Sequence, residues 1–392
     1  MNLNLVTDEV QNFITEHLTD AVTKIALSKS PFKNIEPREL AEQIDGRKRS
    51  EKKLPHWFST PKIFFPPKLS IEQSSSELTA EYKSRLAKGD ALIDLTGGFG
   101  VDAYYFAKKC SKVIHCEQNL QLSEIVEYNS KLLGIENIEF INSDSLTYLL
   151  NDSAVYDTIY IDPSRRIQTQ KVFLLKDTEP DVVSNLPLLL SKASKIIIKT
   201  SPLFDIQSGL KELSNVREVH VVSVKNDCKE LLWIVDKDFT GEPIIVCAAL
   251  KNHLEDQLTF KLSDEKNLTI NQYSPPLQYL YEPDVALLKA GCFKSITRKF
   301  DVIKLHSNTH LYTSDKLSNI FVGKKFKVLA VAEYKDFLKE ISIKKANVIC
   351  RNFPYTPDQV KKKHKLIDGG ADYLFFTTVV QKGLVVIHAV VF

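Results

Sequence analysis

From Ala91 onwards, the chain alternates apolar, strand-like segments with helical ones, and this alternation limits the possible folds more than any other feature. The predicted strands lie at residues 91–95, 112–117, 138–144, 156–162 and 195–201. Helical stretches separate them at residues 101–110, 122–134, 145–150 and 179–193. Largely apolar strands that alternate with helices are typical of a parallel sheet covered on both faces, so we predict an α/β, Rossmann-like core.

Two further strands are predicted at 218–224 and 230–236, and the short polar turn 225–229 joins them. Parallel strands need a much longer crossover, so this pair must be antiparallel. We therefore expect a seven-stranded sheet that ends in an antiparallel pair.

The chain on either side of this core is patterned differently. Before it, apolar residues recur at helical spacing in 10–27 and 37–44, and a third helix with a serine cap is predicted within 74–87. After it, residues 241–320 show little pattern apart from one predicted helix within 274–291.

The C-terminal segment returns to a clear pattern. Its predicted order is strand 325–333, helix 334–345, strand 347–353, helix 356–366 and strands 371–380 and 383–392. Thr356 is placed to cap the second of these helices, and Pro357 stands in its first turn. This segment is predicted to be a small α+β domain.

Composition excludes several classes of protein. With 392 residues, two to four domains are expected. The longest apolar runs fall far short of the roughly 20 residues of a membrane helix, and the N-terminus lacks the layout of a signal peptide. Six scattered cysteines without a C-x-x-C pair indicate reduced thiols and a cytoplasmic protein, and the dispersed histidines argue against a metal site.

The stretch LIDLTGGFGVDAYYFA, residues 92–107, is the main candidate for a ligand-binding loop. A glycine-rich turn between a strand and a helix is typical of nucleotide binding. The spacing Gly98-x-Gly100-x-x-Ala103 fits the fingerprint of NAD-binding proteins, but this match alone is weak. The competing interpretation is the S-adenosylmethionine loop of class I methyltransferases, in which an acidic residue ends the first strand. Asp94 takes that place.

Charge separates these two interpretations. The first four strands each end in an acidic residue: Asp94, Glu117, Asp144 and Asp162. In open α/β sheets the ligand lies above the carboxyl ends of the strands. Four carboxylates around one crevice suit a cationic ligand and disfavour a pyrophosphate, so the pattern favours S-adenosylmethionine over NAD.

Each residue of this predicted cofactor site has an expected role. Thr96, Gly97, Gly98 and Gly100 form the loop that approaches the methionine part of the ligand. We expect Asp94 to accept from the ligand ammonium group, Glu117 from the ribose hydroxyls and Asp144 from the adenine amino group. The alternative for any one of these acids is a solvated loop residue or a helix cap.

The sequence YIDPSRR, residues 160–166, ends the fourth strand, where amino-methyltransferases carry an Asp/Asn-Pro-Pro-aromatic motif. We predict that Asp162, Pro163 and Arg165 form the catalytic part of the site, with Asp162 orienting the substrate. Ser164 and Arg165 replace the second proline and the aromatic residue, which puts stacking on a flipped base in doubt. Arg165 and Arg166 are either phosphate clamps or a solvated loop.

The Asp-Pro-x-Arg form also resembles the loop of RNA uracil-5-methyltransferases. Those enzymes need a cysteine nucleophile after the fifth strand, and no cysteine lies between Cys116 and Cys228. This argues against uracil chemistry.

Taken together, the motifs resemble a bacterial group of class I S-adenosylmethionine-dependent methyltransferases that end in a THUMP-like domain. The shared motifs include GRKRSEKKLPHW, LSIEQSSSELTAEYK, DLTGGFGVD, IDPSRR, KTSP and YEPDVALLKAG. The resemblance implies a ferredoxin-like segment before the C-terminal domain, an RNA substrate, and a contact of Ser75, Ser76 or Thr79 with the cofactor. The domains expected are 1–75 (helical), 76–240 (Rossmann-like), 241–320 (ferredoxin-like) and 321–392 (THUMP-like).

Two basic clusters are candidates for RNA binding. One runs through Arg47, Lys48, Arg49, Lys52 and Lys53 beside the aromatic Trp57 and Phe58, and the other is Lys361, Lys362, Lys363 and Lys365. Because the net charge is only +3, an affinity for RNA has to come from such local patches. Solvated helix faces are the alternative for both.

Two other functions stay open on the sequence alone: an NAD(P)-dependent oxidoreductase, and an RNA-binding protein with a vestigial methyltransferase fold.

Overall fold

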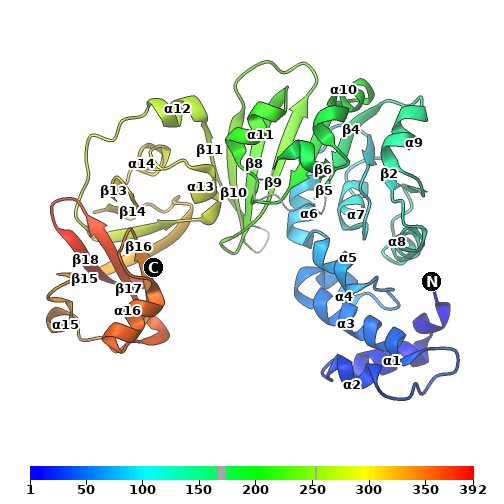
Figure 1. The fold of residues 1–392 in the computed structure, drawn as a ribbon, viewed down its shortest axis with the longest axis horizontal. Coiled ribbons are helices and arrows are strands. Elements are labelled where there is room, and N and C mark those ends of the chain that lie inside the picture. Colours follow the sequence, from blue (N-terminus) through cyan, green and yellow to red (C-terminus); the bar gives the residue numbers. More distant parts are fainter. Residues whose placement is uncertain (166–173, 252–253) are drawn as a thin grey trace. The chain divides into compact units, whose positions relative to one another are not determined.

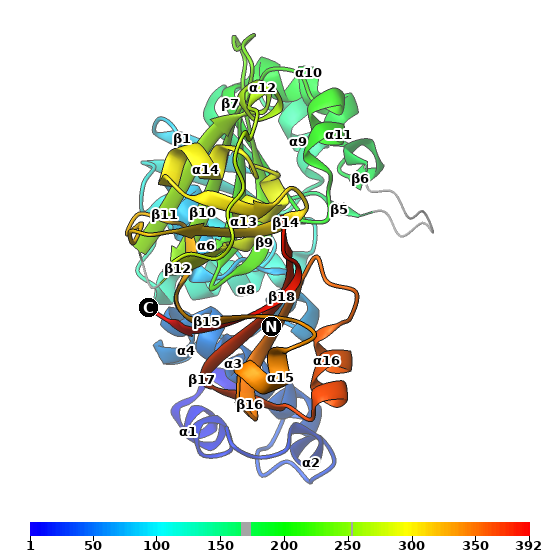
Figure 2. The same cartoon turned by 90° about the vertical axis from the view of Figure 1, so that its left-hand side faces the viewer.

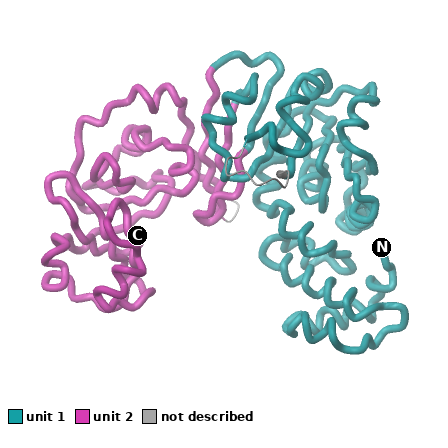
Figure 3. The backbone as a smooth tube through the Cα atoms, in the orientation of Figure 1, with its two compact units in different colours: residues 1–217, 232–241 teal, residues 218–231, 242–392 magenta. Residues whose placement is uncertain are grey.

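The computed structural model describes residues 1–165, 174–251 and 254–392. Two compact units divide the chain, one formed by residues 1–217 and 232–241 and the other by residues 218–231 and 242–392 (Figure 3). We call them unit 1 and unit 2.

Unit 1 begins with short helices, drawn in blue in Figure 1. They are η1 (Leu3–Val6), α1 (Asp8–Glu16), α2 (Val22–Ala26), α3 (Pro37–Lys53), α4 (Pro55–Ser59), α5 (Lys68–Gln73) and α6 (Glu77–Ser84). The helix predicted at 10–27 is therefore two helices, α1 and α2. The helix predicted at 37–44 continues to Lys53 and includes the first basic cluster. Ser76 caps α6, as the sequence predicts.

One hydrophobic core joins these helices to the Rossmann-like part of unit 1. It contains Leu40 and Ile44 of α3 and Trp57 of α4. Val101 and Val126, from the helices that follow the first two strands, belong to the same core. The N-terminal helical region thus packs on the two helices that follow the first and second strands of the sheet.

The Rossmann-like part confirms the predicted alternation of strands and helices. Its strands are β1 (Ala91–Asp94), β2 (Lys112–Cys116), β3 (Ile138–Ile141), β4 (Tyr156–Ile161) and β7 (Ala193–Thr200). Its helices are α7 (Val101–Ala107), α8 (Leu120–Leu132), α9 (Ser145–Asn151), α10 (Val182–Lys192) and α11 (Ile206–Glu212). Three shorter elements, η2 (Leu175–Asp177), β5 (Ser164–Arg165) and β6 (Thr178–Glu179), lie between β4 and α10.

The order of the parallel strands locates the crevice. It is β7-β4-β1-β2-β3, so β1 pairs with both β2 and β4. After β3 the chain returns to the other side of β1. Ligands of open α/β sheets bind beside such a reversal, above the strands' carboxyl ends.

The sheet does not end in the predicted antiparallel pair. The strands β8 (Val216–Val224) and β9 (Asp227–Asp236) form where expected, but β10 (Ile244–Lys251) pairs parallel with β8, and β11 (Leu254–Lys261) pairs antiparallel with β10. Within the described residues the sheet has nine strands, two more than expected. The sequence leaves β10 unassigned because a short apolar run without neighbouring helices in a regular alternation fits a buried strand and a buried helix segment equally well.

The rest of unit 2 is built on a second sheet, of seven strands within the described residues, in the order β13-β14-β12-β15-β18-β17-β16. These strands are β12 (Tyr279–Pro283), β13 (Ile303–His306), β14 (Thr309–Ser314), β15 (Gly323–Glu333), β16 (Lys345–Arg351), β17 (Ile367–Val379) and β18 (Gly383–Val391). The helices of this unit are α12 (Leu262–Asn267), α13 (Val285–Ala290), α14 (Ser295–Phe300), α15 (Phe337–Glu340) and α16 (Pro357–His364). Figure 2 shows α15 and α16 beside β16 and β17.

The C-terminal part of unit 2 follows the predicted element order. Thr356 caps α16 in a capping box with Gln359, and Pro357 occupies the first turn. Successive residues of a strand point to opposite faces of the sheet, and each face has its own hydrophobic core. Phe375 belongs to the core on one face, and Phe376 belongs to the core on the other face, where it packs with α15 and α16. The predicted helix within 274–291 is shorter, because its first half is the strand β12.

None of the helices in the described ranges combines the length and the apolar character that crossing a membrane requires.

Candidate active site

The loop between β1 and α7 needs glycines mainly because the side chains of His115 and Val126 pack directly against it. A Cβ at Gly97 would lie 2.3 Å from the His115 ring, and one at Gly100 would lie 2.2 Å from Val126. Gly98 has a left-handed φ of 52°, which favours glycine, and the atom nearest to its Cβ position, the Thr96 carbonyl oxygen, lies at an ordinary contact distance of 3.8 Å. From the sequence, we expect all three glycines to let the loop approach the ligand. A Cβ at Gly97 or Gly100 would already collide with the protein itself, whereas one at Gly98 would not, so a ligand contact is the remaining reason for glycine there besides its positive φ.

The backbone N–H groups of this loop are largely used inside the protein. They donate from Thr96 to Asp94 Oδ1 (2.9 Å), from Gly97 to the Cys116 carbonyl (2.8 Å), from Gly98 to Glu117 Oε2 (2.9 Å) and from Gly100 to the Gly97 carbonyl (2.9 Å). A bound phosphate would need such donors for itself. The loop is therefore poorly equipped to hold a pyrophosphate.

Asp94 is the most deeply buried of the four strand-end acids, with 1% of its surface exposed. Burial raises its pKa well above the usual range, and the nearby carboxylates Asp102, Asp162 and Glu117 raise it further, against the Thr96 hydrogen bond, which lowers it. A cation placed here would relieve this accumulation of negative charge.

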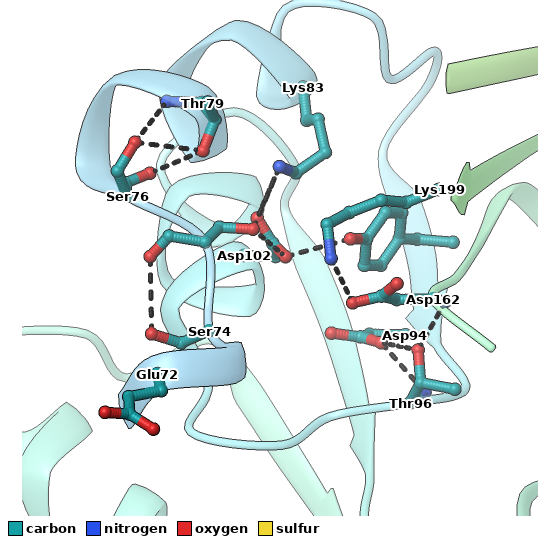
Figure 4. Close-up of polar contacts among 12 residues, drawn as sticks. Glu72, Ser74, Ser76, Thr79, Lys83, Asp94, Thr96, Asp102, Asp162 and Lys199 are labelled. Atoms are coloured by element: carbon teal, nitrogen blue, oxygen red, sulfur yellow. Dashed lines mark hydrogen bonds and ion pairs between the residues drawn. The ribbon is translucent and has the colours of Figure 1, made fainter. Parts of the chain in front are cut away.

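Asp162 follows β4 and lies beside Asp94 and Thr96 (Figure 4). Its backbone N–H donates to Thr96 Oγ1 (2.7 Å), and its Oδ2 forms an ion pair with Lys199 Nζ. Pro163 follows it and is buried. Thr96 therefore links Asp94 to Asp162.

Lys199, near the end of β7, is a site residue that the sequence analysis did not single out. A signal exists in KIIIKTS, where one cation interrupts an apolar strand just before its carboxyl end. This signal can be interpreted only once β7 is known to lie beside β4, because that pairing brings Lys199 to Asp162.

Glu117 and Asp144 are held differently from the two inner acids. Glu117 accepts from the N–H groups of Gly98 (2.9 Å) and Asn119 (2.8 Å). Asp144 caps α9 by accepting from the Thr147 N–H (2.8 Å), and the hydrogen bonds from Thr147 lower its pKa. Both carboxylates support the backbone here, and their expected cofactor contacts stay predictions.

A buried polar cluster joins the segment before α6 to α7. Ser75 and Tyr160 donate to Asp102 Oδ2 (2.8 and 2.9 Å), while Lys83 Nζ lies 3.3 Å from Asp102 Oδ1 and 3.0 Å from Ser75 Oγ. Burial alone would raise the pKa of Asp102, but Lys83, Lys199 and the two hydroxyl donors together lower it below the usual value. Sequence analysis missed this cluster, because Asp102 and Lys83 resemble ordinary surface residues of helices.

The three hydroxyl residues implied by the resemblance all have partners within unit 1. Ser75 bonds Asp102, Ser76 caps α6 by accepting from the Thr79 N–H, and Thr79 Oγ1 donates to the Ser76 carbonyl (3.0 Å). A cofactor contact for any of them remains a prediction.

Arg165 lies in β5, whose backbone pairs with β6, so that Arg165 stands opposite Thr178. Arg166 lies outside the described residues. Their expected contact with substrate therefore stays a prediction.

The first basic cluster is largely occupied by contacts within unit 1. Arg47 donates to Thr15 Oγ1, Lys48 to the Asp20 carbonyl and Lys53 to the Ile71 and Glu72 carbonyls, while Arg49 pairs with Asp45 and Glu72. These cations hold α3 to its neighbours, and the aromatic Trp57 beside them is buried.

The second basic cluster, on α16, is more exposed. Lys361 pairs with Asp358 and Asp368, and the Lys363 ammonium lies over the rings of Tyr334 and Tyr355 (5.2 and 4.6 Å). Lys362 is exposed to solvent.

Comparison with a solved structure decides the family. A crystal structure from Porphyromonas gingivalis W83, proposed to be that of a methyltransferase, shares 30% identity and a TM-score of 0.88 and covers 100% of this chain and 98% of that one. The chain belongs to this methyltransferase family. Residues 279–321 match a ferredoxin-like domain and residues 323–389 a THUMP domain-like family, which confirms the C-terminal modules that the resemblance implies.

Two curated relatives match over shorter stretches. An uncharacterized RNA methyltransferase from Mycoplasma mobile is 33% identical over 75 residues, which is 19% of this chain and 21% of the relative. Another from Fusobacterium nucleatum is 40% identical over 78 residues, which is 19% of this chain and 17% of the relative. The chain therefore spans about a fifth of each curated relative.

Proposed function

We propose that this protein transfers a methyl group from S-adenosylmethionine to RNA. The observation that carries the proposal is the buried Asp94 at the carboxyl end of β1, close to the carboxylates of Asp102, Asp162 and Glu117, in a chain of the methyltransferase family. The THUMP-like segment and the two RNA methyltransferase relatives support RNA as the substrate.

The charges of the crevice fit S-adenosylmethionine better than NAD. S-adenosylmethionine brings an ammonium and a sulfonium, which suit a site where burial and then neighbouring carboxylates raise the pKa of Asp94. NAD brings a pyrophosphate, which would meet the same carboxylates and find the loop N–H groups already engaged. This difference supports the methyltransferase assignment over the oxidoreductase alternative.

When bound, S-adenosylmethionine supplies a methyl group attached to a positively charged sulfur. In our proposal Asp94 accepts from the ligand ammonium, Glu117 from the ribose hydroxyls and Asp144 from the adenine amino group. Gly98, which has no side chain, lets the backbone of the loop approach the ligand closely. Asp162 orients the acceptor group of the substrate.

The test of this function has two steps. Calorimetry on the purified full-length protein should detect S-adenosylmethionine and S-adenosylhomocysteine and no NAD. Total RNA from a strain lacking the gene should then accept label from methyl-labelled S-adenosylmethionine, whereas RNA from the parent strain, already modified, should accept much less. RNA binding without cofactor binding would instead support the vestigial, non-catalytic alternative.

We expect the exposed lysines of α16 to contribute to RNA affinity. Each phosphate contact on a single strand contributes a slope of about −0.7 in the salt dependence of binding, so replacing Lys362 and Lys363 by alanine should flatten it by about 1.4. Lys361 should add little, because two aspartates already neutralise it.

The matched control changes Lys335 and Lys339 to alanine, since these lysines are also exposed and lie in the same segment. Filter binding across a salt series compares the slopes. Equal slopes for all three proteins would show that the α16 lysines are only a solvated face.

A further inference from the structure

The ion pair between Asp162 and Lys199 bears on which atom of RNA accepts the methyl group. Both groups stand at the carboxyl ends of neighbouring parallel strands, β4 and β7. The Asp162 side chain is 31% exposed and that of Lys199 is 14% exposed, so the pair is accessible in part while remaining largely shielded from water. Figure 4 shows Lys199 directed at Asp162, close to Asp94 and Thr96.

Lys199 helps Lys83 to lower the pKa of Asp102, and it forms an ion pair with Asp162. Asp102 already has the fully buried Lys83 and the hydroxyl donors Ser75 and Tyr160. The contact that Lys199 makes with Asp162 thus adds a second cation to the site, placed at the residue expected to meet the substrate.

This cation disfavours an amino group as the acceptor. A neutral amine attacks through its lone pair and becomes positively charged, so it benefits from an unpaired carboxylate and suffers from an adjacent ammonium. The loop also lacks the proline and the aromatic residue that hold a flipped base in amino-methyltransferases, since Ser164 and Arg165 stand there.

A hydroxyl acceptor has the opposite requirement. Its oxygen becomes a good nucleophile only as it loses a proton, so it needs a proton acceptor and a cation that stabilises the developing negative charge. A carboxylate joined to an ammonium provides both. Within an RNA chain, the hydroxyl available at every internal nucleotide is the ribose 2′-hydroxyl.

We infer that the acceptor is a ribose hydroxyl of RNA, with Asp162 taking its proton and Lys199 holding Asp162 and the acceptor oxygen in place. This inference rests on the proposed function. The new bond joins the hydroxyl oxygen to the methyl carbon, and the bond from that carbon to the donor sulfur breaks, leaving a neutral thioether. The hydroxyl proton passes to Asp162 Oδ2 and then to solvent.

The first test locates the methyl group. RNA from the deletion strain is labelled by the purified enzyme and digested to nucleosides, and mass spectrometry assigns the label to sugar or base. Label on the ribose is expected, together with resistance of the labelled linkage to alkali. Label on a base nitrogen or carbon would overturn the inference and leave the proposed function intact, whereas failure to bind S-adenosylhomocysteine would contradict both.

The second test concerns the pair itself. Lys199→Met should slow transfer by about 10²-fold or more, as expected for a disrupted proton-transfer site. Lys199→Arg, which keeps the charge, should recover most of this loss, and Lys195→Met, on the same strand but bonded to the Leu86 carbonyl, should have no effect. Unchanged transfer in Lys199→Met would overturn the role of Lys199.

A binding measurement checks the placement without any RNA. S-adenosylmethionine and S-adenosylhomocysteine differ by one methyl group and one positive charge, so the ratio of their affinities reports the charge beside the sulfur. Lys199→Met should shift this ratio toward S-adenosylmethionine and Asp162→Asn away from it, each by about threefold or more. Affinity for S-adenosylhomocysteine should stay within about threefold. An unchanged ratio in both variants would place the pair away from the transfer point and overturn the inference.

Discussion

The four strand-end carboxylates form two pairs that the fold treats differently. Asp94 ends the central strand β1 and is fully buried near other carboxylates, and Asp162, which follows the neighbouring strand β4, is partly buried and paired with Lys199. Glu117 and Asp144 follow the outer strands β2 and β3, where backbone N–H groups already satisfy them. Acids at equivalent positions of the sequence pattern therefore differ in how much free energy it costs to keep them charged. Asp94, for which this cost is highest, is the best indicator of a ligand.

The largest effect should come from Asp94. Replacing it by alanine removes a charged hydrogen bond worth roughly 1.5–3 kcal/mol, so affinity for S-adenosylmethionine should fall about tenfold to a hundredfold. Asp94→Asn is the matched control: it keeps the acceptor for the Thr96 N–H but not the charge, and should lose nearly as much. Calorimetry that finds unchanged affinity in both variants would remove Asp94 from the cofactor site.

The pH dependence of binding should be the next largest effect. Burial and the neighbouring carboxylates raise the pKa of Asp94, so at any pH below that pKa a cationic ligand has to displace a proton from it. Affinity should rise with pH, by at most about tenfold per unit, until the pH exceeds that pKa. Calorimetry in buffers of different ionisation enthalpy should detect the released proton in the wild type and not in Asp94→Asn.

The raised pKa of Asp94 also makes the stability of the folded protein depend on pH, but stability falls as the pH rises, whereas affinity for the ligand increases. A folded-state pKa above the unfolded value stabilises the protein at low pH, and this contribution is lost as pH rises through the folded pKa. Asp94→Asn should therefore raise Tm relative to the wild type most clearly at the alkaline end. Parallel melting curves for the two proteins at every pH would contradict the shifted pKa.

Glu117 should give a smaller loss, of about tenfold, in Glu117→Ala, as expected for one charged hydrogen bond at a more exposed position. Glu117→Gln keeps an acceptor for one of the two backbone N–H groups and should lose less. If both variants bind the cofactor as the wild type does, Glu117 supports the loop and nothing more.

Asp144 should show the smallest effect on binding. Asp144→Ala loses the cap of α9, at about 1 kcal/mol of stability. Asp144→Ser restores a cap but shortens the side chain, so it separates the two roles. Recovery of both Tm and affinity in the serine variant would show that Asp144 is only a helix cap.

Sequence patterns predict the parts of this molecule that depend on local order. The strand–helix alternation, the acids at 94, 117, 144 and 162 and the cap at Thr356 all follow from residues close together in the chain. The partners of those acids do not. Lys199 meets Asp162 across 37 residues, and Ser75 meets Asp102 across 27, so both contacts depend on how strands and helices are placed.

The basic clusters show the same limit. A run of cations on α3 and one on α16 look alike in the sequence, yet the first is occupied by helix-to-helix contacts. Only the fold reveals which cations have partners.

The second sheet has a consequence for how the C-terminal modules can be separated. The ferredoxin-like and THUMP-like segments are distinct along the chain, yet β12 of one is hydrogen-bonded to β15 of the other, from Tyr279 opposite Lys327 to Pro283 opposite Gly323. A cut at their sequence boundary would leave β15 with a bare edge along this stretch, and exposed edges favour aggregation. The two segments therefore form one structural unit. Gene fusions or truncations that leave the second sheet intact must keep residues 279–391 together.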